Sequence, residues 1–187
     1  FGLVLRDPWP GLVPLVFHAD DTQRWCDLAG VSADVVASTA GHEEGFRENM
    51  LITHRGLSGP AILQISSYWK PGTALHLDLA PEREVLRPLL DSRLHRDAAA
   101  LGNALRSVFS GRLADRLAAL ITPQGFTNKA LEQLEQRLHR WEFLPLGTEG
   151  YEKAEVTAGG VDTDELSART MESHRVPGLY FIGEVLD

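Results

Sequence analysis

The sequence is poor in cysteine, in positive charge and in long apolar runs. Cys26 is the one cysteine among 187 residues, so no intrachain disulfide and no cysteine-based metal site can form. No apolar run approaches the roughly 20 residues that a membrane-spanning helix needs. Asp and Glu number 26 against 18 Lys and Arg, and the net charge of −8 argues against general binding to nucleic acid or acidic membranes. We therefore expect a protein of the reducing cytoplasm with neither a membrane nor a nucleic acid as its partner.

The composition that remains is that of a globular protein, with 43% hydrophobic and 24% charged residues. The length suits one domain of ordinary size or two small ones. The chain opens on FGLVLRDPWP without a Met and ends in a strand-like run, so we expect it to be a fragment of a longer protein.

Apolar residues alternate with polar ones over much of residues 1–80, which predicts strands at residues 12–17, 31–38, 46–52 and 73–79. Residues 39–42, TAGH, suit a hairpin turn. One helix is expected to interrupt the strands at residues 58–69, with Ser58 as its N-cap and Pro60 in its first turn. These pieces predict a small mixed or antiparallel barrel or sheet.

The apolar spacing then changes to a helical one over residues 81–145. Four short amphipathic helices are predicted, and Thr127 is a good cap for the last. Their stripes are Leu86, Leu89, Leu90 and Leu94; Leu101, Leu105 and Val108; Leu113, Leu117, Leu120 and Ile121; and Leu131, Leu134, Leu138 and Trp141. Residues 146–187 return to strand and turn, with strands expected at 153–157 and 179–182. The fold class is therefore α+β: a β-rich unit, a short helical bundle and a C-terminal β segment.

Two glycine motifs could carry a ligand. Gly159 and Gly160 follow the first C-terminal strand, and they suit either a tight turn with positive φ or a close approach to a flat ligand. The dipeptide alone favours the turn. Gly183 and Glu184 end the second strand, which we expect to be buried on both faces, as in a parallel sheet. Ligands bind beyond the carboxyl ends of such strands, although an ordinary turn with a solvated Glu184 is the simpler interpretation.

The two motifs together are more specific than either alone. TAGGV at residues 157–161 and VPGLYFIGE at 176–184 resemble the late portion of two-domain FAD oxidoreductases of the glutathione-reductase and fumarate-reductase kind. Three further stretches narrow the match: THRGLSGPAILQISSYW at 53–69, GFTNKALEQLEQRLHRW at 125–141 and PLGTEGYEKAEVTAGGVDTDELSARTMES at 145–173. With them, the chain resembles the bacterial aminoacetone oxidase family of FAD-binding enzymes, which includes BaiN-type proteins.

This resemblance implies FAD as the cofactor, NAD(P)H as a possible electron donor and a small molecule as substrate. The implied contacts are the glycine pair against the isoalloxazine ring and the Gly-Glu strand end on the ribityl chain. They fall on Thr157, Ala158, Gly159, Gly160, Gly183, Glu184 and Asp187. The resemblance assigns no catalytic residue.

The chain departs from this family in one respect. Family members begin with a G-x-G-x-x-G fingerprint that cradles the FAD pyrophosphate, and no such fingerprint occurs here. We therefore expect residues 1–80 and 81–145 to form the insert domain, and residues 146–187 to be an incomplete return segment of the FAD-binding domain. The partner of the chain would be the rest of that domain, and the chain alone is expected to be inactive and to bind FAD weakly.

A second candidate site is the start of the helix at Ser58. His54 and Arg55 precede it, and a helix N-terminus beside a His and an Arg could bind a substrate carboxylate or carbonyl. A capped helix start with solvated neighbours is the simpler interpretation. His42 beside Glu43 could suggest a metal, but adjacent strand residues point to opposite faces, so we expect no metal site. The alternative to a flavoprotein is a non-catalytic interaction or scaffold module in which the glycines are turns.

Overall fold

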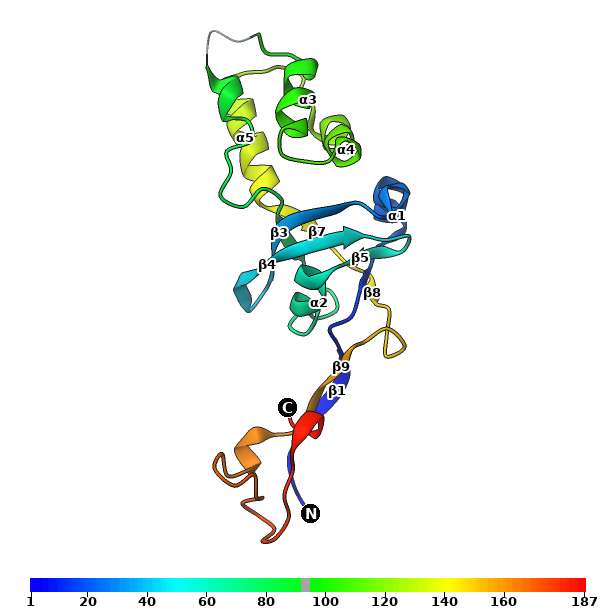
Figure 1. The fold of residues 1–187 in the computed structure, drawn as a ribbon, viewed down its shortest axis with the longest axis vertical. Coiled ribbons are helices and arrows are strands. Elements are labelled where there is room, and N and C mark those ends of the chain that lie inside the picture. The colour runs from blue at the N-terminus through cyan, green and yellow to red at the C-terminus, as the bar shows by residue number, and fades with distance from the viewer. Residues whose placement is uncertain (92–94) are drawn as a thin grey trace.

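The computed structural model describes residues 1–91 and 95–187, so the predicted position of Leu94 on a helical stripe lies outside the described residues. The described molecule is elongated (Figure 1). Three helices occupy one end, a sheet lies in the middle, and a two-stranded ribbon leads to the other end, where both termini lie. The α+β fold class expected from the sequence is confirmed.

The central sheet has seven strands in the order β7-β6-β3-β4-β5-β2-β8, and all its pairs are antiparallel. The strands are β2 (Leu15–Val16), β3 (Ser32–Thr39), β4 (His42–Ile52), β5 (Gly56–Ser58), β6 (Leu75–Asp78), β7 (Trp141–Phe143) and β8 (Gly147–Thr148). Thr39 pairs with His42, so the predicted hairpin turn is confirmed. The strand predicted at 12–17 is shortened to β2. Pro14 precedes β2 and has no amide proton to donate to a neighbouring strand.

One face of the sheet forms the core. Val35 and Ala37 of β3 and Leu75 and Leu77 of β6 are fully buried at alternate positions, as the period of two requires. Helix α2 (Pro60–Ser66) packs against β3 and β4 with its own buried residues. Helix α1 (Ala19–Trp25), which the sequence patterns did not predict, brings Trp25 edge-on against two aromatic rings of β7.

The helical end contains α3 (Ala98–Arg106), α4 (Gly111–Ile121) and α5 (Asn128–His139). Thr127 caps α5 as predicted, because its side chain accepts a hydrogen bond from the Ala130 amide. The described residues of the first predicted helix form only a 3-10 turn, Arg87–Leu90. Pro88 prevents this turn from continuing toward the N-terminus as an α-helix. Trp141 was wrongly predicted on the α5 stripe. The helix ends at His139, and Trp141 lies on β7.

The ribbon consists of β1 (Leu5–Gly11) and β9 (Val156–Val161), which pair antiparallel. The strand predicted at 153–157 starts later, because the Lys153 amide closes a turn onto the Gly150 carbonyl. The strand predicted at 179–182 is absent: Tyr180 makes one isolated bridge to Glu172, and Ile182 is 76% exposed. Two backbone hydrogen bonds join this stretch to residues 171–173, from the Ser173 amide to the Leu179 carbonyl oxygen and from the Phe181 amide to the Met171 carbonyl oxygen, but they do not extend into a strand pair. The divisions at residues 80 and 145 stay a prediction.

Candidate functional site

The glycine pair lies inside strand β9, not in a turn after it. Trp9 of β1 pairs with Ala158 and Arg6 pairs with Gly160, with an irregularity between Arg6 and Trp9. Gly159 faces this irregularity with a φ of 81°, and a Cβ there would lie 2.5 Å from the Asp7 carbonyl oxygen. Only glycine permits both this φ and this approach of two backbones.

The structure brings the second glycine motif beside the first. Val161 and Leu186 form a parallel bridge, and the Asp187 amide donates to the Val161 carbonyl oxygen at 3.1 Å. The Arg6 guanidinium forms ion pairs with carboxylates of both segments, with Asp162 at 2.7 Å and with Asp187 at 3.8 Å. The two groups of predicted cofactor residues therefore belong to adjacent segments, although more than twenty positions separate them in the sequence. The groups are Thr157 to Gly160, and Gly183, Glu184 and Asp187.

These residues differ in how well they could meet a flavin. Gly159 and Gly160 contact the chain itself, whereas a Cβ on Gly183 would meet no described atom within 4 Å. Thr157, Gly183 and Glu184 are exposed. Among the described residues, none forms a hydrogen bond or ion pair with the Glu184 carboxylate. The arrangement fits a ligand that contacts exposed backbone and whose hydroxyl groups donate hydrogen bonds to a carboxylate.

The second candidate site is arranged differently from the prediction. Ser58 belongs to β5 and is not the cap of α2. Gly59 holds that position, and no side chain of the described part hydrogen-bonds there. A Cβ on Gly59 would lie 2.7 Å from the Asn49 carbonyl oxygen, so the helix start is closed against β4. His54 and Arg55 are exposed, and Arg55 pairs with Glu149 at 3.5 Å. Their role in binding a substrate stays a prediction.

The other end of α2 faces the ribbon. Ser66 Oγ accepts a hydrogen bond from the Val13 amide at 2.9 Å, and Ser67 Oγ accepts one from the Leu12 amide at 3.2 Å. Because α2 has seven residues, its two ends lie about 10 Å apart along the helix axis. The contact between α2 and the ribbon is thus made by the carboxyl end of the helix.

An apolar hollow of about 370 Å³ lies at this contact. Its lining comes from β1, from the residues after α2 and from β8, and includes Trp9, Pro10, Tyr68, Lys70, Pro71 and Thr148. Trp9 is 38% exposed and Tyr68 is 51% exposed. Sequence reasoning missed this hollow, because 59 positions separate its two exposed aromatic rings, Trp9 and Tyr68; the third aromatic residue of the lining, Trp69, is buried. The one available signal was the pair of large aromatic residues outside the apolar stripes.

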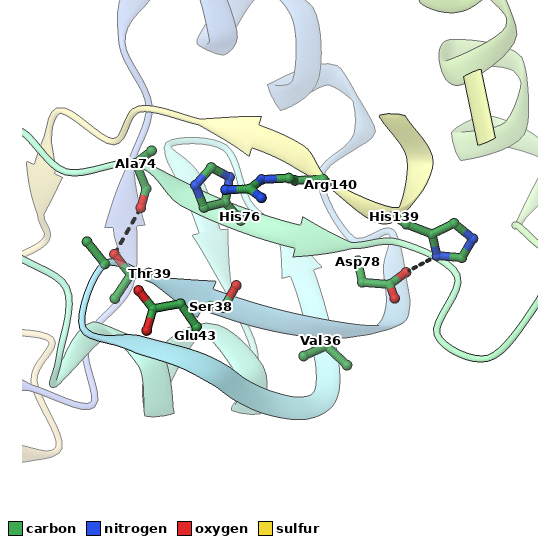
Figure 2. Close-up of a pocket in the computed structure, with 10 residues that line it drawn as sticks. Val36, Ser38, Thr39, Glu43, Ala74, His76, Asp78, His139 and Arg140 are labelled. Carbon is green, nitrogen blue, oxygen red and sulfur yellow. Dashed lines mark hydrogen bonds and ion pairs between the residues drawn. The ribbon is translucent and has the colours of Figure 1, made fainter. Parts of the chain in front are cut away.

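A second hollow, of about 440 Å³, is polar and lies on the outer face of β3 and β6 (Figure 2). It is lined by Ser38, Glu43, His76, Asp78, His139 and Arg140, among others. His139 Nδ1 lies 2.8 Å from Asp78 Oδ1. Acidic and basic groups are balanced here, which favours neither an anion nor a cation. No cluster of three or more His, Cys, Asp or Glu in the described residues is arranged to hold a metal ion.

A match to the model of a known family identifies the family of this chain. Residues 9–156 match the model described as the HI0933-like protein barrel and H2TH domain. The chain belongs to the HI0933-like family. The matched range begins in β1 and ends at the first residue of β9, so the HI0933-like domain comprises the sheet and the helices, and the ribbon is its boundary.

Three relatives of this HI0933-like chain are informative. The ribosomal RNA dihydrouridine synthase of Escherichia coli is 46% identical over 100% of the chain and 48% of its own length. The Haemophilus influenzae protein of the same name is 39% identical over 100% of the chain and 47% of its own length. The 3-dehydro-bile acid delta(4,6)-reductase of Clostridium scindens is 31% identical over 85% of the chain and 43% of its own length.

The chain spans about half the length of the curated relatives it matches. The HI0933-like family is related to FAD-binding flavoproteins, which agrees with the broader part of the resemblance found in the sequence. None of the described helices is long and apolar enough to cross a membrane.

Proposed function

We propose that the full-length protein is a flavin-dependent reductase that converts a uridine of ribosomal RNA to dihydrouridine. This chain would be its insert domain together with part of its flavin site. The observation that carries the proposal is the 46% identity to the Escherichia coli relative of that name, which extends over the whole chain.

The reaction adds one hydride and one proton across the C5–C6 double bond of the base, so it needs a two-electron donor. FAD supplies the hydride when it is bound and reduced, and a nicotinamide of the NAD(P)H class is the proposed source of its electrons. The residues of this chain hold the cofactor in the proposal. Thr157, Gly183 and Glu184 offer exposed polar groups. Gly159 allows β1 to approach β9 closely, and Gly160 allows the C-terminal segment to do so.

This proposal sets aside the expectation, drawn from a net charge of −8, that nucleic acid is not a partner. Net charge describes the average field, whereas recognition of a single-stranded loop depends on local rings and a few cations. The proposal also narrows the substrate from an unspecified small molecule to a base within an RNA. The Clostridium scindens relative is named for a steroid substrate, but its identity to the chain is lower and covers less of it.

The test is the dihydrouridine content of ribosomal RNA in a strain from which the full-length gene is deleted. Purified ribosomal RNA is digested to nucleosides, and dihydrouridine is quantified by mass spectrometry. We expect the deletion to remove dihydrouridine and the wild-type gene to restore it. An unchanged dihydrouridine content in the deletion strain would overturn the proposal.

A further inference from the structure

Two exposed aromatic rings from distant parts of the chain line the apolar hollow at the ribbon. Trp9 belongs to β1, and Tyr68 follows the carboxyl end of α2. Both rings are more than one third exposed, although large aromatic side chains usually gain stability by burial. A concave surface with two exposed rings is suited to a flat, mostly apolar group.

The Tyr68 ring is already held in place. It stacks on the His42 ring with a centroid distance of 4.2 Å and an angle of 13° between the planes. The His42 ring in turn stacks on Phe46 at 4.8 Å. A ligand that stacks on the remaining surface of Tyr68 therefore orders little additional side chain, which lowers the entropic cost of binding.

The position of the hollow ties it to the flavin residues. Trp9 pairs with Ala158 across the ribbon, and Gly159 is the next residue along β9. A group bound against Trp9 therefore lies one strand away from the predicted flavin site. This neighbourhood suits a nucleotide that adjoins the reacting base in the same RNA strand.

One cation lies in the lining. Lys70 is exposed, and among the described residues none pairs with its ammonium group. Its backbone is fixed by a turn, because the Lys70 amide donates to Thr73 Oγ1 and the Thr73 hydroxyl donates to the Lys70 carbonyl oxygen. Aromatic rings with one nearby cation are the means by which proteins bind single-stranded RNA, through base stacking and a phosphate contact.

We propose that this hollow stacks an unpaired base of the RNA substrate, next to the uridine that is reduced, and that Lys70 contacts the adjoining phosphate. The inference rests on the proposed function. It adds a second base-binding position, separate from the reacting base, that the names of the relatives do not specify.

The test measures binding of a single-stranded oligouridylate of about eight nucleotides, within the usual site size of 4–16, to the full-length protein. Tyr68→Ala should weaken binding about 5- to 150-fold, the range of about 1–3 kcal/mol per stacked base. Tyr68→Phe keeps the ring and should bind within about twofold of wild type. Tyr151→Ala removes an exposed tyrosine outside the lining and should have no effect.

Lys70→Gln gives a second, independent readout. Removing one phosphate contact should reduce the slope of log affinity against log salt concentration by about 0.7, the value per phosphate for single strands. Lys129→Gln, an exposed lysine of α5 outside the hollow, should leave the slope unchanged.

Wild-type affinity in Tyr68→Ala would overturn the stacking position, as would an equal loss in Tyr68→Phe. Absence of oligouridylate binding by the wild-type protein would overturn it too, and the dihydrouridine content of the deletion strain then shows whether the proposed function has also failed. Binding of a bile acid in place of the RNA, with loss in Tyr68→Ala, would assign the hollow to a steroid and contradict the inference.

Discussion

A Cβ on Gly160 would lie 2.3 Å from the backbone oxygen of Val185. No real side chain tolerates such a contact with backbone, so only glycine allows β9 and the C-terminal segment to pack together at this point. The contact joins the two motifs for which the family resemblance predicts contact with a flavin, and it makes their relative position testable.

Gly160→Val should push the C-terminal segment away from β9 and reduce the flavin content of the full-length protein. The control is Gly150→Ala, because Gly150 also has a positive φ, of 78°, but a Cβ there meets no described atom within 4 Å. The comparison of the two variants therefore separates the effect of crowding from the effect of backbone strain, which costs about 1–2 kcal/mol. Flavin absorbance per mole of purified protein measures the effect, and full occupancy in Gly160→Val would contradict the prediction.

Glu184→Ala should weaken retention of the flavin without changing the fold, because Glu184 is exposed. Loss of a hydrogen bond to a charged acceptor predicts an about 10- to 150-fold higher Kd for FAD. Glu152→Ala, an exposed carboxylate in the turn before β9, serves as control. The Kd can be measured by quenching of flavin fluorescence, and equal values for the two variants would remove Glu184 from the site.

The period of apolar residues was sufficient to predict much of the fold. It gave β3, β4 and β6, the hairpin between β3 and β4, and the three helices α3 to α5, because one buried face imposes a period of two on strands and of 3.6 on helices. It failed for α1, in which Trp25 is the only fully buried residue. It also failed for residues 179–182, whose apolar run has no neighbouring strand among the described residues.

The candidate site was predictable only where residues are close in sequence. The glycine motifs were found because each is a short string, but their contact through Val161 and Leu186 depends on a long chain reversal. The apolar hollow was missed because Trp9 and Tyr68 come together only when the end of α2 packs on the ribbon.

His139 should make stability depend on pH near neutrality. Partial burial lowers its pKa, but hydrogen bonds and charge interactions with Asp78 and Glu135 outweigh burial, so the pKa is raised above 6.5. The bound proton stabilises the folded state below pH 6.5, and this contribution is lost as the pH rises through the folded pKa. Solvent screening reduces the size of this effect, because the ring is only partly buried.

The measurement is Tm between about pH 6 and about pH 8, across the range in which histidine titrates. His139→Gln should flatten the fall in Tm over this range, whereas His174→Gln, at an exposed position, should not. An identical pH profile for wild type and His139→Gln would refute the assignment.

Arg116 should hold the helical end against the 3-10 turn that follows α1, Cys26–Leu28. It pairs with Asp27 at 2.5 Å, and its hydrogen bond is the main cause that lowers the pKa of Asp27. Arg116→Gln should therefore increase amide hydrogen exchange in α4 and around Asp27. The wild-type contact should weaken only as the pH falls toward and below the ordinary Asp pKa of 3.8.

The matched control is Arg106→Gln, which breaks the ion pair with Asp115 within the helical end. Exchange around Asp27 should stay at the wild-type rate in that variant. If both variants raise exchange there equally, the effect is a general loss of helix stability and the Arg116 contact has no special role.

The chain enters and leaves the HI0933-like domain through one narrow ribbon (Figure 1). Most of β1 is exposed, and only its carboxyl end packs against α2. Paired strands resist stretching but bend across their faces, and the ribbon can therefore act as a hinge for the whole domain. Because Trp9 is paired with Ala158 across the ribbon, we expect a swing of the domain to change the space above the residues predicted to bind flavin without breaking a strand pair.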